Sequence, residues 1–192
     1  ALYYNSTGNY NTATGLRALY SNSTGNDNTA SGLMALSLNT TGKSNTAAGR
    51  AALYSNTTGY SNVAVGPRAL FENLTGHNLV AVGDSALYNN TALGNTAIGS
   101  KSLYTNTTGS SNSALGDHSL YSNTSGLSNT AVGDDAMYNN STGDYNAALG
   151  RLSMNSNTTG NFNTTIGYSA GSLATTNANC TFLGYNADNS GG

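Results

Sequence analysis

A seventeen-residue repeat runs through almost the whole chain, and it limits the fold more than any other feature of the sequence. The phrase Asn-Thr-Ala-Val-Gly, or a close variant, starts at Asn11 and returns every seventeen residues, with a single sixteen-residue step between Leu79 and Asn95. About eleven units result, and the idealised unit reads N-T-A-V-G-x-x-A-L-Y-x-N-T-T-G-x-x. Self-similarity at a fixed period is typical of repeat proteins, in which each unit packs against its neighbours along one axis.

The unit is too short and too rich in Gly, Asn and Thr to be a helical repeat. A helical repeat needs about 33 residues or more, and these residue types are poor helix formers. We expect two short strands in each unit, at T-A-V and at A-L-Y, with turns at the recurring Gly and at N-T-T-G. The sequence therefore predicts an all-β fold, a parallel β-solenoid or β-roll of about eleven coils over residues 1–184. Residues 185–192 are expected to form a Gly/Asn-rich tail or a linker to a missing segment.

Stacked units place like residues above like residues, about 4.8 Å apart. We expect the Ala, Val-like and Leu columns of the repeat to fill the interior. One coil offers little apolar surface at about 25 cal/mol per Å², whereas it must fix seventeen residues. We therefore expect each coil to bury a second apolar face, most simply against another copy of the chain.

The phrase N-[ST]-A-[VIL]-G, as in NVAVG (62–66), NTAIG (95–99) and NTAVG (129–133), resembles the head repeat of trimeric autotransporter adhesins, the YadA-like head family. Long repeats of this kind are also similar to those of phage or viral tail fibres and large bacterial surface proteins. The resemblance covers nearly the whole chain. It implies a left-handed parallel β-roll, three chains around one axis and a role in surface attachment. The coil is longer than the usual family repeat, and the sequence carries no neck, stalk or membrane anchor.

The composition argues against several other classes of protein. Only 7% of the residues are charged and the net charge is −2, so no basic surface attracts nucleic acid or anionic lipid. No stretch has the length of an apolar membrane span. The single Cys180 has no intrachain partner for a disulfide, and His77 and His118 lie in different units. No metal-ligand spacing or nucleophile motif is present, so we expect neither an enzyme nor a cofactor.

An aromatic column is the first candidate site. The position after the repeat Leu is mostly aromatic, and we expect the rings to stack and to seal a sheet or a subunit seam. The alternative is a flat aromatic strip that binds carbohydrate. The residues are Tyr20, Tyr54, Phe71, Tyr88, Tyr104, Tyr121 and Tyr138.

The N-T-T-G turns supply the second candidate site, because most of them begin an Asn-x-Ser/Thr sequence. They are candidate N-glycosylation sites, or simply good turn residues. Glycans on every coil would be crowded at about 4.8 Å spacing. The candidates are Asn22, Asn39, Asn56, Asn73, Asn106, Asn123, Asn140 and Asn157.

The favoured function is an extracellular structural or adhesive fibre segment on a cell surface or virion, a homotrimeric rod that makes weak multivalent contacts. The alternative is a subunit of a stacked, N-glycosylated extracellular filament. A minor alternative is an ice-binding solenoid, since Thr recurs before the repeat Ala, although Val63, Val80 and Ala147 interrupt the row. The expected partners are other copies of the chain and host-surface carbohydrate or protein, with no nucleic acid and no membrane insertion.

Overall fold

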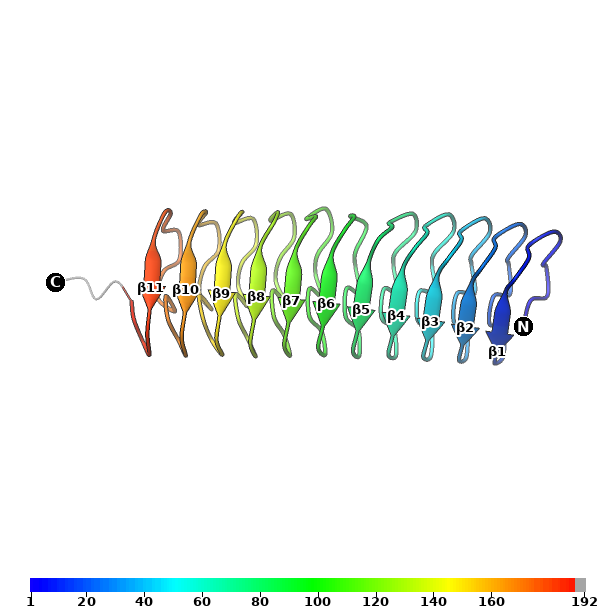
Figure 1. Ribbon diagram of the computed structural model, residues 1–192, viewed down its shortest axis with the longest axis horizontal. Helices are drawn as coiled ribbons and strands as arrows, with labels where there is room; N and C mark the ends of the chain where they lie inside the picture. The colour runs from blue at the N-terminus through cyan, green and yellow to red at the C-terminus, as the bar shows by residue number, and fades with distance from the viewer. Residues whose placement is uncertain (189–192) are drawn as a thin grey trace.

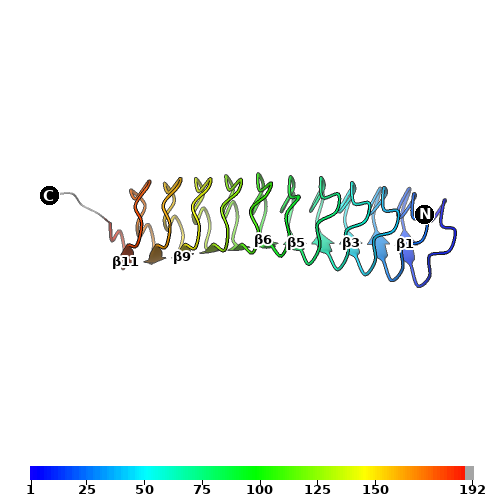
Figure 2. The same cartoon turned by 90° about the horizontal axis from the view of Figure 1, so that it is seen from above.

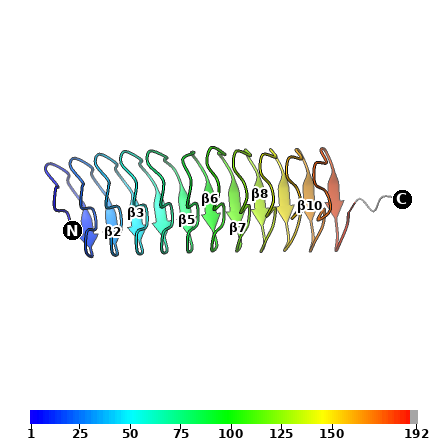
Figure 3. The ribbon, with the colours of Figure 1, turned by 180° about the vertical axis from the view of Figure 1, so that it is seen from behind.

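The computed structural model describes residues 1–188, which form a rod of stacked coils (Figure 1). Eleven three-residue strands make one parallel sheet in the order β1 to β11. The coils follow one another from the N-terminal end to the C-terminal end (Figure 3), with the strands along one side and turns along the other (Figure 2). The strands are β1 (Thr12–Thr14), β2 (Thr29–Ser31), β3 (Thr46–Ala48), β4 (Val63–Val65), β5 (Val80–Val82), β6 (Thr96–Ile98), β7 (Ser113–Leu115), β8 (Thr130–Val132), β9 (Ala147–Leu149), β10 (Thr164–Ile166) and β11 (Thr181–Leu183).

The predicted parallel β-solenoid is confirmed, and so is the alignment of its units. Each strand pairs in parallel with its copy in the next coil, so that Ala13 lies beside Ala30 and Ala47 beside Ala64. The shortened coil does not disturb this register, because Ala81 still pairs with Ala97. The missing residue is therefore absorbed outside the sheet, in the turn that precedes β6.

The second strand predicted at A-L-Y is wrong. This segment turns, and its Leu adopts the left-handed backbone region, with φ of 48° at Leu19 and 51° at Leu120. Such a conformation costs an L-residue roughly 1–2 kcal/mol. Two gains offset that cost: the Leu side chain is fully buried, and its N–H donates to the next coil, as Leu19 does to the Ala35 carbonyl at 3.0 Å. A turn thus provides the inter-coil hydrogen bonds that a strand would have made.

The apolar interior is narrow. It consists mainly of the Ala at the centre of strands β2 to β9, the Ala that precedes the repeat Leu in most coils, and the Leu or Met of the turn, from Leu19 to Met154. The Val-like column, which was predicted to lie inside, faces outward instead: Ile98 is 40% and Leu115 47% exposed. The reason is geometric, because a three-residue strand with an inward central residue must turn both flanking side chains to the outside.

Two columns of asparagine complete the interior. In the turn column, Asn39 Nδ2 donates to Asn22 Oδ1 of the preceding coil at 2.7 Å and to the Gly42 carbonyl at 3.0 Å. In the strand column, Asn45 N–H donates to Asn28 Oδ1 at 3.0 Å. These side chains are fully buried. Buried amides must be hydrogen-bonded to be tolerated, and continuous ladders satisfy that requirement coil by coil.

The ladders break at the shortened coil. Leu79 stands where the strand column has Asn, and Asn90 Nδ2 donates to the Ala92 carbonyl at 2.9 Å instead of to the coil before it. Asn73 Oδ1 is consequently the one buried side-chain oxygen or nitrogen in residues 1–188 that has no hydrogen-bond partner. The deletion therefore leaves the sheet intact but weakens the polar interior beside it.

The last coil departs from the repeat in a compensated way. Gly171 occupies the Leu position, and Phe182 occupies the Ala position of the next coil and packs with Ala170 and Ala174. A Cβ on Gly171 would lie 3.1 Å from the Phe182 ring, so the large residue fills the space that the missing Leu leaves. Gly171 N–H also donates to the Ala187 carbonyl at 2.7 Å. The first part of the predicted tail thus bonds to the rod, and residues 189–192 lie outside the described residues.

Candidate functional site

The outward side of the sheet is the most extensive surface that the repeat builds. We call it the outer face, and it consists of the first and third residues of strands β1 to β11. The first residues are mainly Thr, and the third residues change along the rod from small and polar to large and apolar. The third residues are Thr14, Ser31, Ala48, Val65, Val82, Ile98, Leu115, Val132, Leu149, Ile166 and Leu183. A continuous exposed row of this kind is typical of an interaction surface.

A shallow groove of about 230 Å³ crosses the outer face between β8 and β10. Val132, Leu149 and Ile166 line it, together with Thr130 and Thr164. Its cause is local, because Ala147 replaces the Thr of the other coils and leaves a notch between Thr130 and Thr164. The notch at Ala147 therefore leaves room on the outer face for a side chain of another molecule.

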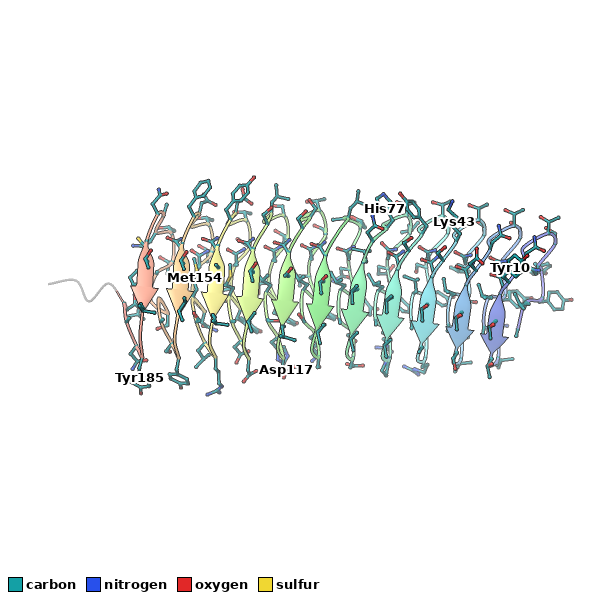
Figure 4. The ribbon with its side chains drawn as sticks, viewed as in Figure 1. Tyr10, Lys43, His77, Asp117, Met154 and Tyr185 are labelled. Atoms are coloured by element: carbon teal, nitrogen blue, oxygen red, sulfur yellow. The ribbon has the colours of Figure 1, made fainter. Side chains whose placement is uncertain are left out.

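One edge of the outer face carries most of the charge of the rod. We call it the charged edge, and it consists of the two residues that follow the Gly at the end of each strand. Figure 4 shows Asp117 and Tyr185 along this edge, where the strand arrows end, with Lys43 and His77 along the opposite edge. The charged edge is basic at β1, β3 and β4 and mostly acidic from β5 to β8. Its ionisable residues are Arg17, Arg50, Arg68, Asp84, Lys101, Asp117, His118, Asp134, Asp135 and Arg151.

Within residues 1–188, the acidic part of this edge contains ion pairs, whereas the arginines of the basic part form none. Asp134 Oδ2 lies 3.0 Å from Arg151 Nε. Burial raises the pKa of Asp135, and the neighbouring Asp134 charge raises that pKa further. Arg50 and Arg68 form no ion pair or side-chain hydrogen bond within residues 1–188. Their guanidinium groups are thus available to an outside carboxylate.

The basic part also borders a groove. Arg50 and Arg68 line an open cleft of about 350 Å³ together with the apolar Leu33, Met34 and Phe71. Ala51 lies within it and leaves the space that larger residues fill in other coils. The cleft combines positive charge with an apolar floor, which suits an anionic group on an apolar stem.

The predicted aromatic column is present as a stack of half-buried rings. Ring centroids lie 5.2 Å apart from Tyr54 to Phe71 and 5.0 Å apart from Tyr121 to Tyr138, with nearly parallel planes. Tyr88 and Tyr104 continue the stack between them. Tyr20 is separated from it, because the intervening coil has Ser37. Neighbouring rings cover one another's faces within the stack, so the column exposes ring edges to solvent. A sugar would need an exposed ring face to stack on. Carbohydrate binding by this column stays a prediction.

The candidate glycosylation sites lie inside the rod. All eight are fully buried members of the turn column: Asn22, Asn39, Asn56, Asn73, Asn106, Asn123, Asn140 and Asn157. An N-linked glycan attaches at Nδ2, the atom that holds the ladder together, as in the 2.7 Å bond from Asn123 to Asn106. The Asn-x-Ser/Thr sequences lie in the turns of the rod, and the burial of their Asn side chains argues against glycans on the folded chain.

The two histidines and the cysteine lie in separate coils of the rod. Within residues 1–188, no three or more His, Cys, Asp or Glu side chains lie close enough to hold a metal ion. His77 stacks on Tyr60 at 4.3 Å and His118 lies 3.2 Å from Asp117. Cys180 is a free, partly exposed thiol. In the same part of the chain, nothing qualifies as a helix of the length and hydropathy that a membrane crossing requires.

No protein-family model, curated protein or solved structure matches this chain.

Proposed function

We propose that this chain is a non-enzymatic extracellular rod that gives a fibre stiffness and reach, and that associates with other copies of itself along the outer face. The exposed apolar row of the outer face carries the proposal. Val65, Ile98, Leu115 and Leu149 are each 39–49% exposed although nothing in the repeat requires large apolar residues there. Thr14 and Ser31 occupy the same position in the first coils. The strand therefore forms without a large apolar residue at this position.

Stiffness follows from the continuity of the hydrogen bonds. Each coil is joined to the next by strand pairing and by turn amides, and the buried asparagine ladders reinforce this joining except where the shortened coil interrupts them. A rod of this kind separates its two ends by a fixed distance, on the order of 50 Å at the strand spacing of parallel sheets. The same surface recurs in each coil, which favours many weak contacts with a host carbohydrate or protein.

Association compensates for the narrow core. The interior of most coils holds one Leu or Met and one or two Ala beside the asparagines. Covering the outer face removes further apolar area from water at about 25 cal/mol per Å². The resemblance to YadA-like heads implies three chains around one axis, and an end-to-end filament is the alternative assembly.

Light scattering tests the self-association. We expect a mass of two or more chains for the protein, and a monomer after Ile98→Thr and Leu115→Thr, which install the residue type found at Thr14. Circular dichroism should be unchanged in the variant. A wild-type protein that stays monomeric at high micromolar concentration contradicts the proposal.

Ice binding is the second candidate, and the outward direction of the Thr row supports it. Thr29, Thr46 and Thr130 are exposed on the outer face, spaced along a rod whose coils repeat at about 4.8 Å. The exposed apolar row beside these Thr residues argues against ice binding by a surface made of hydroxyl groups alone. Inhibition of ice recrystallisation that is lost in a Thr29→Lys, Thr46→Lys variant would support this function, and its absence at high protein concentration would exclude it.

A further inference from the structure

We propose that the second copy packs antiparallel on the outer face, related to the first by a two-fold axis that runs parallel to the strands and passes between β5 and β6. This inference rests on the self-association proposed above and specifies its geometry. The partner is an identical chain, and the surfaces that meet are the two outer faces and the two charged edges.

The symmetry fixes which coils meet. Rotation about an axis parallel to the strands reverses the rod but preserves the strand direction, so the charged edges of both copies lie together. β1 then lies opposite β10, β2 opposite β9, β3 opposite β8, β4 opposite β7 and β5 opposite β6. Such an isologous interface presents each contact twice, which is the usual arrangement of protein dimers.

The order of charges along the charged edge fits this arrangement. At β3 and β8, Arg50 meets Asp134 and Asp135 of the second copy. In the described part of the chain, Arg50 of the β3 coil and Arg68 of the β4 coil have no ion pair within their own copy. Edge charges of this kind favour the correct register more than they add affinity.

The other two opposed coils are complementary as well. Arg68 at β4 meets Asp117 at β7, and Asp84 at β5 meets Lys101 at β6. Parallel rods would need a two-fold axis along the rod, which reverses the strands and places the charged edge of one copy beside the opposite edge of the other. The complementary charges of the charged edge do not meet in that alternative.

The sizes of the apolar residues are complementary in the same register. Ala48 of β3 faces Val132 of β8, and Ser31 of β2 faces Leu149 of β9, so a small residue opposes a large one. At the centre, Val82 faces Ile98, two residues of similar size. The gap between the sheets therefore stays near the roughly 10 Å of packed sheets along the whole rod. Parallel rods would instead place the third residues of one copy opposite the first residues of the other, with all the large third residues gathered at one end.

The interface area is sufficient and the opposite edge is nearly neutral. An outer face about 50 Å long and 10 Å wide buries on the order of 1,000 Å² in two copies, which is the lower limit for a specific interface. One pairing is unfavourable, because Asp27 beside β2 approaches Asp144 beside β9. Asp144 Oδ1 accepts a hydrogen bond from the Leu127 N–H at 2.7 Å, which directs it along its own rod.

Charge reversal tests the orientation. Arg50→Glu with Arg68→Glu makes both halves of the charged edge acidic, and we expect the dimer dissociation constant to rise about tenfold or more. Adding Asp117→Arg, Asp134→Arg and Asp135→Arg exchanges the two halves, and we expect dimerisation to return. This recovery also shows that the first variant is folded. Parallel rods keep Arg50 and Arg68 away from Asp117, Asp134 and Asp135 of the second copy, so they predict no recovery with the second variant.

Cross-linking on a Cys180→Ser background gives an independent readout. We expect Ala48→Cys with Val132→Cys to form covalent dimers with a short bis-maleimide, and Ala48→Cys alone to form none. Dimers or trimers from Ala48→Cys alone would keep the self-association and overturn the antiparallel arrangement. A wild-type monomer in light scattering would overturn both proposals.

Discussion

Replacement of a single ladder asparagine is expected to be far more costly than replacement of its neighbour in the chain. Asn140 belongs to the buried turn column, whereas Asn139 is exposed. Both are asparagines in the same turn, so Asn140→Ala and Asn139→Ala remove the same atoms from the same segment. The comparison isolates the contribution of the ladder.

The magnitude follows from the contacts of Asn140. Its Nδ2 donates to Asn123 Oδ1 at 2.9 Å and to the Gly143 carbonyl at 3.1 Å, and its Oδ1 accepts from Asn157 Nδ2 at 2.7 Å. The Gly143 carbonyl keeps a bond from Asn129 Nδ2, and Asn157 Nδ2 keeps its bond to the Gly160 carbonyl. Asn123 Oδ1 loses its donor and stays buried. Three lost bonds at about 1 kcal/mol each, with a further penalty for the orphaned oxygen, lower the free energy of unfolding by roughly 3–5 kcal/mol.

Urea unfolding followed by circular dichroism gives the global effect, and amide hydrogen exchange over residues 123–157 gives the local one. The local measurement matters because the coils of a solenoid open in part before the whole chain unfolds. Asn139→Ala should change the free energy of unfolding by less than about 0.5 kcal/mol. If the two variants differ by less than that amount, the ladder does not stabilise the rod as argued here.

Three further outcomes are expected. Gly133→Ala should destabilise the rod by roughly 3 kcal/mol or more, because φ there is 134° and the new Cβ would lie 2.6 Å from the Gly150 carbonyl carbon. Gly94→Ala, at φ 66° with its nearest neighbour 3.9 Å away, is the control in the same thermal melt and should cost about 1 kcal/mol. Asp135→Asn should raise the thermal midpoint of dilute protein at pH 7. The raised pKa means that the ionised carboxylate disfavours the folded state, so the gain should vanish below about pH 4, where the acid is neutral in both states. Peptide mapping of the protein secreted by a glycosylating host should find no glycan on the eight buried turn asparagines. The exposed Asn139, which also begins an Asn-x-Ser sequence, is the internal reference. A glycan on Asn123 of the folded protein would show that the ladder tolerates the loss of one Asn side-chain hydrogen bond.

The period of the sequence was enough to predict the solenoid. When a strand pairs with its copy in the next repeat, only one register places each residue beside its equivalent. The pairing of Ala13 with Ala30 needed no knowledge beyond the spacing of the two residues. The direction of side chains was harder. Nothing in A-L-Y distinguishes a strand from a left-handed turn, since Leu rarely adopts positive φ and does so here only because burial and an inter-coil bond compensate.

The two asparagine columns were the largest omission. Their periodicity was visible, but Asn is ordinarily a surface residue in turns. The Asn-x-Thr pattern also suggested glycosylation, which requires an exposed side chain. A signal was available: Asn123 and its equivalents recur in ten consecutive coils, from Asn5 to Asn157, whereas exposed turn positions such as Lys43 and His77 vary freely. Invariance of a polar residue within a stacked repeat indicates a ladder, because only an identical neighbour can satisfy both its donor and its acceptor.

The pairing of Ala81 with Ala97 across the one-residue deletion has a consequence for how such chains change in length. A coil that loses a residue in its turn still offers the next coil the same row of amides and carbonyls, and so would a coil copied whole. Duplication or excision of the codons for one coil would lengthen or shorten the protein by a single rung of about 4.8 Å without a new hydrophobic core having to evolve. The length of the rod would then depend on the number of repeats in the gene. Recombination between near-identical repeats would change that number.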